Sequence, residues 1–393
     1  MAYKTVSNLR DSVSGMLQGL NLNNVTNLNV ALERTARQVC NKLKIPEATL
    51  RSNFTLYDGV VDYLLPTNIF ASAVVDLRPQ GNARWWNDNV QKQPIEQFDL
   101  EKNWNTSTKF TTEYDNGTGI LRVVSPMPMP RIELDPMTAT TGWTAGGTAS
   151  TPVLDSSVYW QAPDSLRFNV TTGVGTLSKT ITQVDLTDYQ SVGVAFLAFK
   201  TPSGSNLTSI ELRIGSDSSN YYSVTVTSGF IKAFTTNEWM LAAFDLSTAT
   251  TVGSPVITAI DYVDILVTAA ATLTNFYVGD LWISLPFPST LIYQTSAIFL
   301  PSGGSTPLNT ITANTDQILL NDSAYAIYEL ECAIEVAQQQ GGTLASGVIN
   351  TLDQKLNGIR GYRGILIQLG LIDLYRGDNP SQEIRVVGDY YGF

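Results

Sequence analysis

The feature that most constrains the fold is a run of short β-type segments between Arg131 and Phe287. The segments are rich in β-branched and aromatic residues, and clusters of Gly, Ser, Asn and Asp separate them. They cover residues 165–170, 193–199, 207–214, 221–226, 239–244, 262–268 and 276–283. This spacing predicts an all-β sandwich or barrel. No segment of the region has helical periodicity, whereas the sequence on either side does.

The flanking sequence predicts helices at both ends of the chain. Apolar residues recur at helical spacing over residues 6–17 and 28–43, and Pro46 ends the second helix, because the residue before a proline is driven out of the α region. The same spacing over residues 319–337, followed by Gly341, predicts a helix of about five turns. The N-terminal pair either forms its own small core or packs on a neighbouring subunit.

β segments lie between the first helices and the sandwich. Residues 54–66 predict two strands around an Asp58-Gly59 turn, and residues 109–124 predict a further β element. Proline clusters at 126–130 and 286–288 mark the joints of the insertion. The chain is therefore predicted to be an α+β multidomain protein.

The predicted domain organisation has three parts. Residues 1–130 and 288–393 form one discontinuous assembly domain, a helical bundle with β elements. Residues 131–287 form the inserted all-β sandwich, at a surface position of the kind that tolerates insertions.

Charge and composition exclude several classes of function. The 393-residue chain has a net charge of −11, which argues against a general nucleic-acid binder, because such proteins neutralise phosphates with Lys and Arg. Residues 131–287 hold 6 basic and 13 acidic residues, a net charge of −7. Cys40 and Cys332 are predicted to be reduced core residues. No run of 18 apolar residues and no secretory signal is present, so we expect no membrane span and synthesis in a cytoplasm.

The sequence gives no support for catalysis. The chain has no histidine, which removes the Ser-His-Asp triad and every His-containing metal site. A pair of carboxylates remains an option, as in glycoside hydrolysis, but nothing selects two of the 35 acidic residues. We therefore expect a protein that is not an enzyme.

Aromatic residues in the sandwich are candidates for contact with a glycan, because flat rings stack on sugars. The candidates are Trp143, Trp160, Tyr221, Tyr222 and Trp239, with Trp282 as a further one. The alternative is that they belong to the core. Strand alternation alone does not decide which face of the sheet a tryptophan occupies.

The C-terminal residues are candidates for assembly contacts. The last residues alternate as a strand would, and such a strand either folds back on its own sheet or is donated to another subunit. The candidate assembly contacts are Arg360, Arg363, Tyr390, Tyr391 and Phe393, with the two arginines pairing with acidic residues of a neighbour.

The flanking segments resemble a known family. Residues 62–66 (DYLLP), 75–79 (VDLRP) and 375–381 (YRGDNPS), together with the N-terminal helices, resemble virion neck proteins of tailed bacteriophages, which include the head-to-tail adaptors. The resemblance covers roughly residues 1–130 and 288–393. It implies a structural protein of the virion, made in the host cytoplasm. Such a protein forms a ring homo-oligomer between portal and tail or neck proteins, through which DNA passes without sequence-specific binding.

The inserted segment resembles a different family. Residues 164–168 (DSLRF), 185–189 (DLTDY) and 277–283 (YVGDLWI) are similar to the jelly-roll domains of carbohydrate-binding modules. The resemblance implies an outward-projecting jelly-roll sandwich on the connector ring. The alternative is a glycan-binding adhesin, or a tail- or fibre-associated protein, that recognises host surface carbohydrate.

The second resemblance also bears on cofactors. We expect no cofactor from the residues themselves. In the carbohydrate-binding modules an Asp-Asp pair before the last strand often helps to hold a structural calcium ion, and Asp280 matches its second member. The first member is here Gly279.

Overall fold

The computed structural model divides the chain into two compact units. Unit 1 contains Met1–Ser52, Asn68–Asp76 and Leu291–Phe393, and unit 2 contains Asn53–Thr67 and Leu77–Thr290. The structure describes residues 3–17, 28–42, 49–66, 69, 74–79, 91–92, 109–115, 118–124, 130–160, 163–295, 297–340 and 346–352. The candidate assembly contacts Arg360, Arg363, Tyr390, Tyr391 and Phe393 lie outside the described residues.

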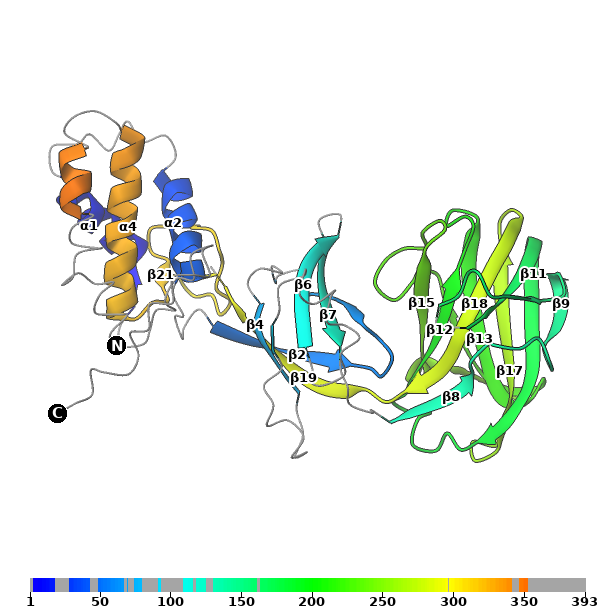
Figure 1. The fold of residues 1–393 in the computed structure, drawn as a ribbon. Helices are drawn as coiled ribbons and strands as arrows, with labels where there is room; N and C mark the ends of the chain where they lie inside the picture. Colours follow the sequence, from blue (N-terminus) through cyan, green and yellow to red (C-terminus); the bar gives the residue numbers. More distant parts are fainter. Residues whose placement is uncertain are drawn as a thin grey trace, which may run out of the picture. The chain divides into compact units, whose positions relative to one another are not determined.

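Unit 1 is built from helices that come from both ends of the chain (Figure 1). Its helices α1 (Val6–Met16), α2 (Leu28–Lys42) and α4 (Asp322–Gln340) confirm the helices predicted from the sequence. Thr5 begins α1 with a capping box, in which its hydroxyl and the Asn8 side chain each accept a hydrogen bond from the other residue's backbone N–H. A short sheet, with the order β1 (Lys4–Thr5), β21 (Gln317–Ile318) and β20 (Phe299–Leu300), completes the unit.

One apolar core holds the helices of unit 1 together. Its members include Val6, Leu9, Val13, Leu32, Ala36, Val39, Tyr328, Ala333 and Val336. The hydroxyl of Tyr328 donates a hydrogen bond of 2.9 Å to the backbone carbonyl of Leu32, which satisfies the one polar group of that buried ring. Cys40 and Cys332 are free thiols buried in the same core, as predicted. Among the described residues, no helix has the length and apolarity that a membrane span requires.

Two small sheets are formed by the segments between the helices and the sandwich. One has the order β2 (Thr49–Leu56), β19 (Phe287–Gln294) and β4 (Val74–Pro79). The other has the order β3 (Asp62–Leu64), β7 (Thr118–Val124), β6 (Lys109–Asp115) and β5 (Gln91–Lys92). The prediction of two strands around an Asp58-Gly59 turn is right for the turn, where Gly59 has a φ of 75°. The two strands, however, pair with β19 and β7 and not with each other.

The region from Arg131 to Ser284 is a β-sandwich, which confirms the all-β prediction. Its strands are β8 (Arg131–Asp135), β9 (Thr144–Ala149), β10 (Val153–Asp155), β11 (Ser165–Val184), β12 (Val194–Lys200), β13 (Leu207–Asp217), β14 (Asn220–Val226), β15 (Trp239–Asp245), β16 (Thr250–Val252), β17 (Ile260–Ala269) and β18 (Leu273–Ser284). The main order is β15-β12-β18-β11-β17-β13-β14-β16.

The long strand β11 links the two layers of the sandwich. Residues 166–170 of β11 pair with β18, and residues 173–184 pair with β17. The sheet therefore folds over on itself around one core (Figure 1). That core takes side chains from β12, β15, β18 and the first part of β11 on one side, and from the second part of β11, β13 and β17 on the other.

The compact unit is larger than the predicted insertion at 131–287. Phe196 on β12 and Trp282 on β18 alternate with core residues, so they lie on the outer face of their layer, yet both are fully buried. Tyr57 covers Phe196, with ring centroids 5.2 Å apart. The backbone N–H of Asp58 donates to the hydroxyl of Ser284 at 2.8 Å. Residues before Arg131 are therefore part of the same folded unit as the sandwich.

Candidate functional site

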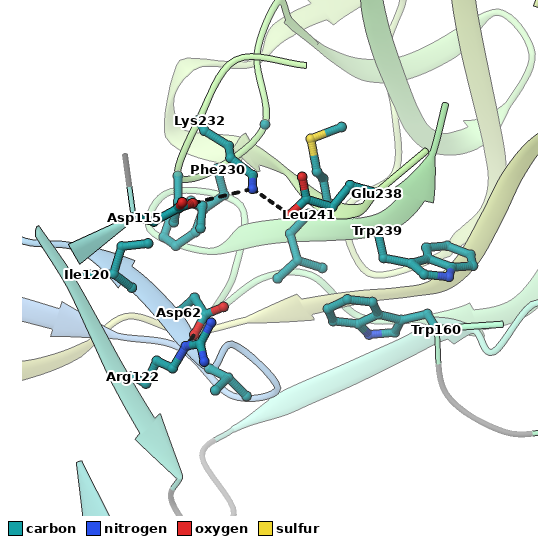
Figure 2. A pocket seen from close by; sticks show the side chains of 14 residues that line it. Asp62, Asp115, Ile120, Arg122, Trp160, Phe230, Lys232, Glu238, Trp239 and Leu241 are labelled. Atoms are coloured by element: carbon teal, nitrogen blue, oxygen red, sulfur yellow. Dashed lines mark hydrogen bonds and ion pairs between the residues drawn. The ribbon is translucent and has the colours of Figure 1, made fainter. Parts of the chain in front are cut away.

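A pocket of about 120 Å³ lies within unit 2, on the outer face of the layer that contains β15 (Figure 2). We call it the tryptophan pocket. Its walls come from the sheet of β3, β6 and β7, from the segment before β15, from β15 itself and from Trp160. The lining residues are Val61, Asp62, Asp115, Ile120, Arg122, Trp160, Gly229, Phe230, Ile231, Lys232, Glu238, Trp239, Met240 and Leu241.

Strand alternation places Trp239 in the pocket. On β15 the residues Met240, Ala242 and Phe244 point into the sandwich core. Trp239 and Leu241 therefore point to the opposite face, where both line the pocket. Trp160 follows β10 in the chain and lies beside Trp239, with ring centroids 6.1 Å apart and ring planes inclined by 55°. Both rings are partly buried, so each keeps an accessible surface.

Gly279 makes room for the two tryptophans. A Cβ atom at this position would lie 2.9 Å from the Cβ of Trp160 and 3.5 Å from the ring of Trp239. The first distance is shorter than real Cβ contacts, so any larger residue would displace Trp160. The Gly279-Asp280 pair, in place of the Asp-Asp pair of the resembled family, is thus explained by the packing of Trp160.

One charged cluster of the pocket comes from the small sheet. Asp62 on β3 lies directly opposite Arg122 on β7 in the strand register, and their side chains form an ion pair of 3.0 Å. Arg122 also pairs with Glu113 on β6 at 2.9 Å. Burial raises the pKa of the Asp62 carboxyl above its ordinary value, and the charge of Arg122 opposes part of that rise. The guanidinium is therefore shared between two carboxylates.

The second charged cluster surrounds Lys232. Its ammonium group lies 2.5 Å from a carboxylate oxygen of Glu238 and 3.8 Å from one of Asp115 (Figure 2). The hydrogen bond from Lys232 lowers the pKa of the Glu238 carboxyl, so this residue stays ionised at neutral pH. The pocket thus presents carboxylate acceptors and cationic donors beside two indole rings.

These residue types suit the recognition of a polar ring compound. Indole faces pack against flat apolar surfaces, while carboxylates accept hydrogen bonds from hydroxyl or amino groups. The indole nitrogen of Trp160 is buried and has no hydrogen-bond partner in the described part of the chain.

The five glycan-contact candidates divide between the pocket and other places. Trp160 and Trp239 lie together in the pocket. Trp143 is only 7% exposed and belongs to the sandwich core, with the Lys179 ammonium 5.6 Å from its ring centroid. Tyr222 packs on the same core.

Tyr221 and Trp282 also lie away from the pocket. Tyr221 lies on the outer face of the other layer, with its ring 4.9 Å from the Arg213 guanidinium. Trp282 is fully buried. Of the named aromatic residues, the structure therefore brings together Trp160 and Trp239 in the pocket.

The charged pocket residues Asp62, Asp115, Arg122, Lys232 and Glu238 were not identified from the sequence. They come from three separate stretches of the chain, and only tertiary packing brings them together. No motif or spacing in the sequence links residue 62 with residue 122 or 232. The Asp62 and Arg122 pair becomes visible only once the partner of β3 is known to be β7.

The surroundings of Asp280 do not fit a calcium site. The guanidinium of Arg131 donates a hydrogen bond of 2.8 Å to the Asp280 carboxylate. A positively charged side chain therefore already lies where a calcium ion would bind. Gly279 supplies no side-chain oxygen. Within the described residues, no three acidic or cysteine side chains are grouped to hold a metal ion. Burial, together with a hydrogen bond to Asp280, raises the pKa of neighbouring Glu133 to about 7.

Comparisons with known proteins show limited similarity. No family model matches the sequence, and no curated protein matches it. One similar solved structure is the family 11 carbohydrate-binding module of Clostridium thermocellum in complex with a β-1,3-1,4-mixed-linked tetrasaccharide. It is 11% identical, with a TM-score of 0.31, and the match covers 40% of this chain and 96% of that chain.

Two further structures are similar to the same extent. The family 30 module of a cellulosomal cellulase from the same organism is 16% identical over 39% of this chain and 97% of that chain, with a TM-score of 0.31. A xylan-binding family 22 domain is 15% identical over 39% of this chain and 93% of that chain, with a TM-score of 0.27. These values are too low to transfer a function. The resemblance of the flanking segments to neck proteins is not addressed by these structures and stays a prediction.

Proposed function

We propose that unit 2 binds carbohydrate in the tryptophan pocket. The observation that carries the proposal is the pair of partly buried indole rings, Trp160 and Trp239, that line a pocket together with charged hydrogen-bonding groups. Sugar rings combine apolar C–H faces with equatorial hydroxyls. The indoles pack against those faces, and the carboxylates of Asp62 and Glu238 accept hydrogen bonds from the hydroxyls.

The role that we propose is binding and not catalysis. Glycoside hydrolysis by two carboxyl groups needs one that is protonated and one that is free to attack or to activate water. In the pocket, Asp62 is paired with Arg122, and Glu238 is paired with Lys232. Lys232 lowers the pKa of Glu238, and Arg122 opposes the rise that burial causes in the pKa of Asp62, so both carboxyl groups are engaged with cations, which suits fixed hydrogen-bond acceptors.

The experiment is a glycan array probed with the full chain and with three variants. We expect the wild type to bind a defined set of glycans, with mixed-linked β-glucans and xylans included as the first ligands to test. Trp160→Ala and Trp239→Ala should each lose that binding. Tyr221→Ala, which removes an aromatic ring outside the pocket, should keep it. Absence of wild-type binding, or equal binding by the tryptophan variants, would contradict the proposal.

A second proposed role concerns unit 1. We propose that this unit builds the chain into the neck of a tailed-phage virion, as a ring homo-oligomer in contact with portal and tail proteins. The observation that favours it is that α1, α2 and α4 close one core from both ends of the chain. Unit 2 is thereby carried as an insertion.

Electron microscopy of the purified protein tests the assembly role. We expect rings of fixed symmetry, and incorporation of a tagged copy at the neck of assembled virions. A protein that stays monomeric at all concentrations and is absent from virions would contradict this role. The carbohydrate-binding proposal would be unaffected, because the pocket lies within unit 2.

A further inference from the structure

The acidic excess of the tryptophan pocket indicates which sugar it selects. The charged residues that line it are three carboxylates, Asp62, Asp115 and Glu238, and two cations, Arg122 and Lys232. Each cation contacts two carboxylates, so neither retains an unshared charge for an anionic ligand. The charged lining residues together have a net charge of −1. A ligand with a positive charge would therefore be attracted to the pocket, and an acidic sugar would be repelled.

The indole rings also favour a ligand with a positive charge. The face of an aromatic ring attracts a cation, and tryptophan does so most strongly. Trp160 and Trp239 therefore offer packing surface to a sugar ring and favourable electrostatics to an ammonium group on that ring. The chain carries a net charge of −11, which adds a long-range attraction for cations at low salt.

The pocket volume limits the size of the group that enters. Pockets for drug-sized ligands are roughly 300–1,000 Å³. A cavity of about 120 Å³ is well below that range and suits a single sugar ring. The remaining residues of a longer glycan would stay outside it.

We propose that the tryptophan pocket selects a single sugar residue that carries a protonated amino group. This inference rests on the proposed carbohydrate function and narrows it to amino sugars. The ammonium group lies among the carboxylates of Asp62, Asp115 and Glu238, while the ring packs on the two indoles. N-acetylation removes the positive charge and enlarges the substituent, so it weakens binding.

Calorimetric titration of the full chain with matched oligosaccharides tests the proposal. The ligands are tetramers of glucosamine, N-acetylglucosamine and glucose, the glucosamine monosaccharide, and spermidine as an amine without a sugar ring. We expect the glucosamine tetramer to bind roughly tenfold more tightly than the other two tetramers at low salt. The monosaccharide should retain most of that affinity, spermidine should bind weakly, and added salt should reduce the preference.

Two variants assign the preference to the pocket. Glu238→Gln removes a carboxylate whose side chain is half exposed, so the fold is expected to tolerate it, and the glucosamine preference should fall several-fold. Asp185→Asn, at an exposed carboxylate outside the pocket that accepts hydrogen bonds from Thr187, should change nothing. An unchanged preference in Glu238→Gln would overturn the assignment.

The outcomes separate this inference from the function on which it rests. If the glucose tetramer binds in the pocket as tightly as the glucosamine tetramer, the amino-sugar inference is wrong and the carbohydrate function stands. If spermidine binds as tightly as glucosamine, the pocket recognises amines without the sugar, and the inference is also wrong. If no saccharide binds, the carbohydrate function fails as well.

Discussion

The indole N–H of Trp282 donates a hydrogen bond of 2.9 Å to the backbone carbonyl of Asp58, a residue 224 positions earlier in the chain. The Trp282 ring stacks on Phe196, with centroids 5.5 Å apart, and the Arg131 guanidinium lies 4.8 Å from its centroid. The outer face of one sandwich layer is thus converted into an interior by residues that precede the sandwich. The tryptophan pocket lies on the same face, where that cover ends.

Substitution of Trp282 tests this interior. Trp282→Phe removes the indole N–H, leaves the Asp58 carbonyl without its donor and opens a small cavity. We expect the free energy of unfolding to fall by about 2–4 kcal/mol, measured by urea denaturation. The partly buried Trp239 provides the control, because Trp239→Phe should lower it by less than about 1 kcal/mol. Equal losses in the two variants would show that Trp282 has no special structural role.

Substitution of Gly59 tests the turn that positions Asp58 against the sandwich. Gly59 has a φ of 75°, and a Cβ there would lie 2.8 Å from a guanidinium nitrogen of Arg131 and 3.2 Å from the Trp282 ring. Gly59→Ala should lower the free energy of unfolding by about 1–3 kcal/mol, because backbone strain and crowding act together. Gly303 has a φ of 78°, and a Cβ there would have no atom within 4 Å, so Gly303→Ala introduces backbone strain without crowding. This control should lower the free energy of unfolding by about 1 kcal/mol. A larger loss of stability in Gly303→Ala than in Gly59→Ala would contradict the role of crowding at Gly59.

The Glu133 carboxyl predicts a pH dependence of stability. Its pKa is raised from 4.5 to about 7 by burial and by the hydrogen bond to Asp280, so the folded protein favours the protonated form. The stabilisation is therefore complete below pH 4.5 and is lost as the pH rises through 7. Because the side chain is 41% exposed, we expect a loss of only about 1 kcal/mol after solvent screening.

Glu133→Gln checks this assignment. The amide can donate to Asp280 at every pH, so the variant should lose the stability change between pH 4.5 and 7 that Glu133 causes. Urea denaturation at several pH values measures it. The groups that face Glu133 are Arg131 and Asp280, and Arg131 also lies 3.7 Å from Asp58. An unchanged pH profile in the variant would assign the dependence to other groups.

Gly279 connects the fold with the pocket. Gly279→Ala places a methyl group 2.9 Å from the Cβ of Trp160, so Trp160 must shift from its position beside Trp239. We expect the affinity for the bound glycan to fall about tenfold, measured by calorimetry, together with a modest loss of stability. Gly15→Ala on α1, where a Cβ meets nothing within 4 Å, should leave the affinity unchanged. Undiminished affinity in Gly279→Ala would remove the proposed role of the glycine.

The elements of the fold were largely predictable because they depend on local periodicity. The 3.6-residue spacing in α1, α2 and α4 and the short β-branched runs of the sandwich are properties of neighbouring residues. The partner of each strand is a tertiary property. The sequence around Asp58-Gly59 shows a turn, but β2 and β3 pair with β19 and β7, which lie far along the chain.

The pocket was predictable only in part, for the same reason. Trp239 belongs to a strand in which both faces are apolar, so alternation did not decide its side. In the structure Met240, Ala242 and Phe244 fill the sandwich core, and this places Trp239 on the outer face. Asp62 and Arg122 meet only because β3 pairs with β7. Nothing in the sequence predicts that residues 57–63 cover the sandwich.

Calorimetric titration of the strongest array ligand into four forms of the full chain is the most direct test of the central claim. The forms are the wild type, Trp160→Ala, Trp239→Ala and the control Tyr221→Ala. The proposal predicts one saturable site in the wild type and in the control, and at least a tenfold weaker Kd in each tryptophan variant. Equal Kd values in all four forms would contradict a carbohydrate site between Trp160 and Trp239.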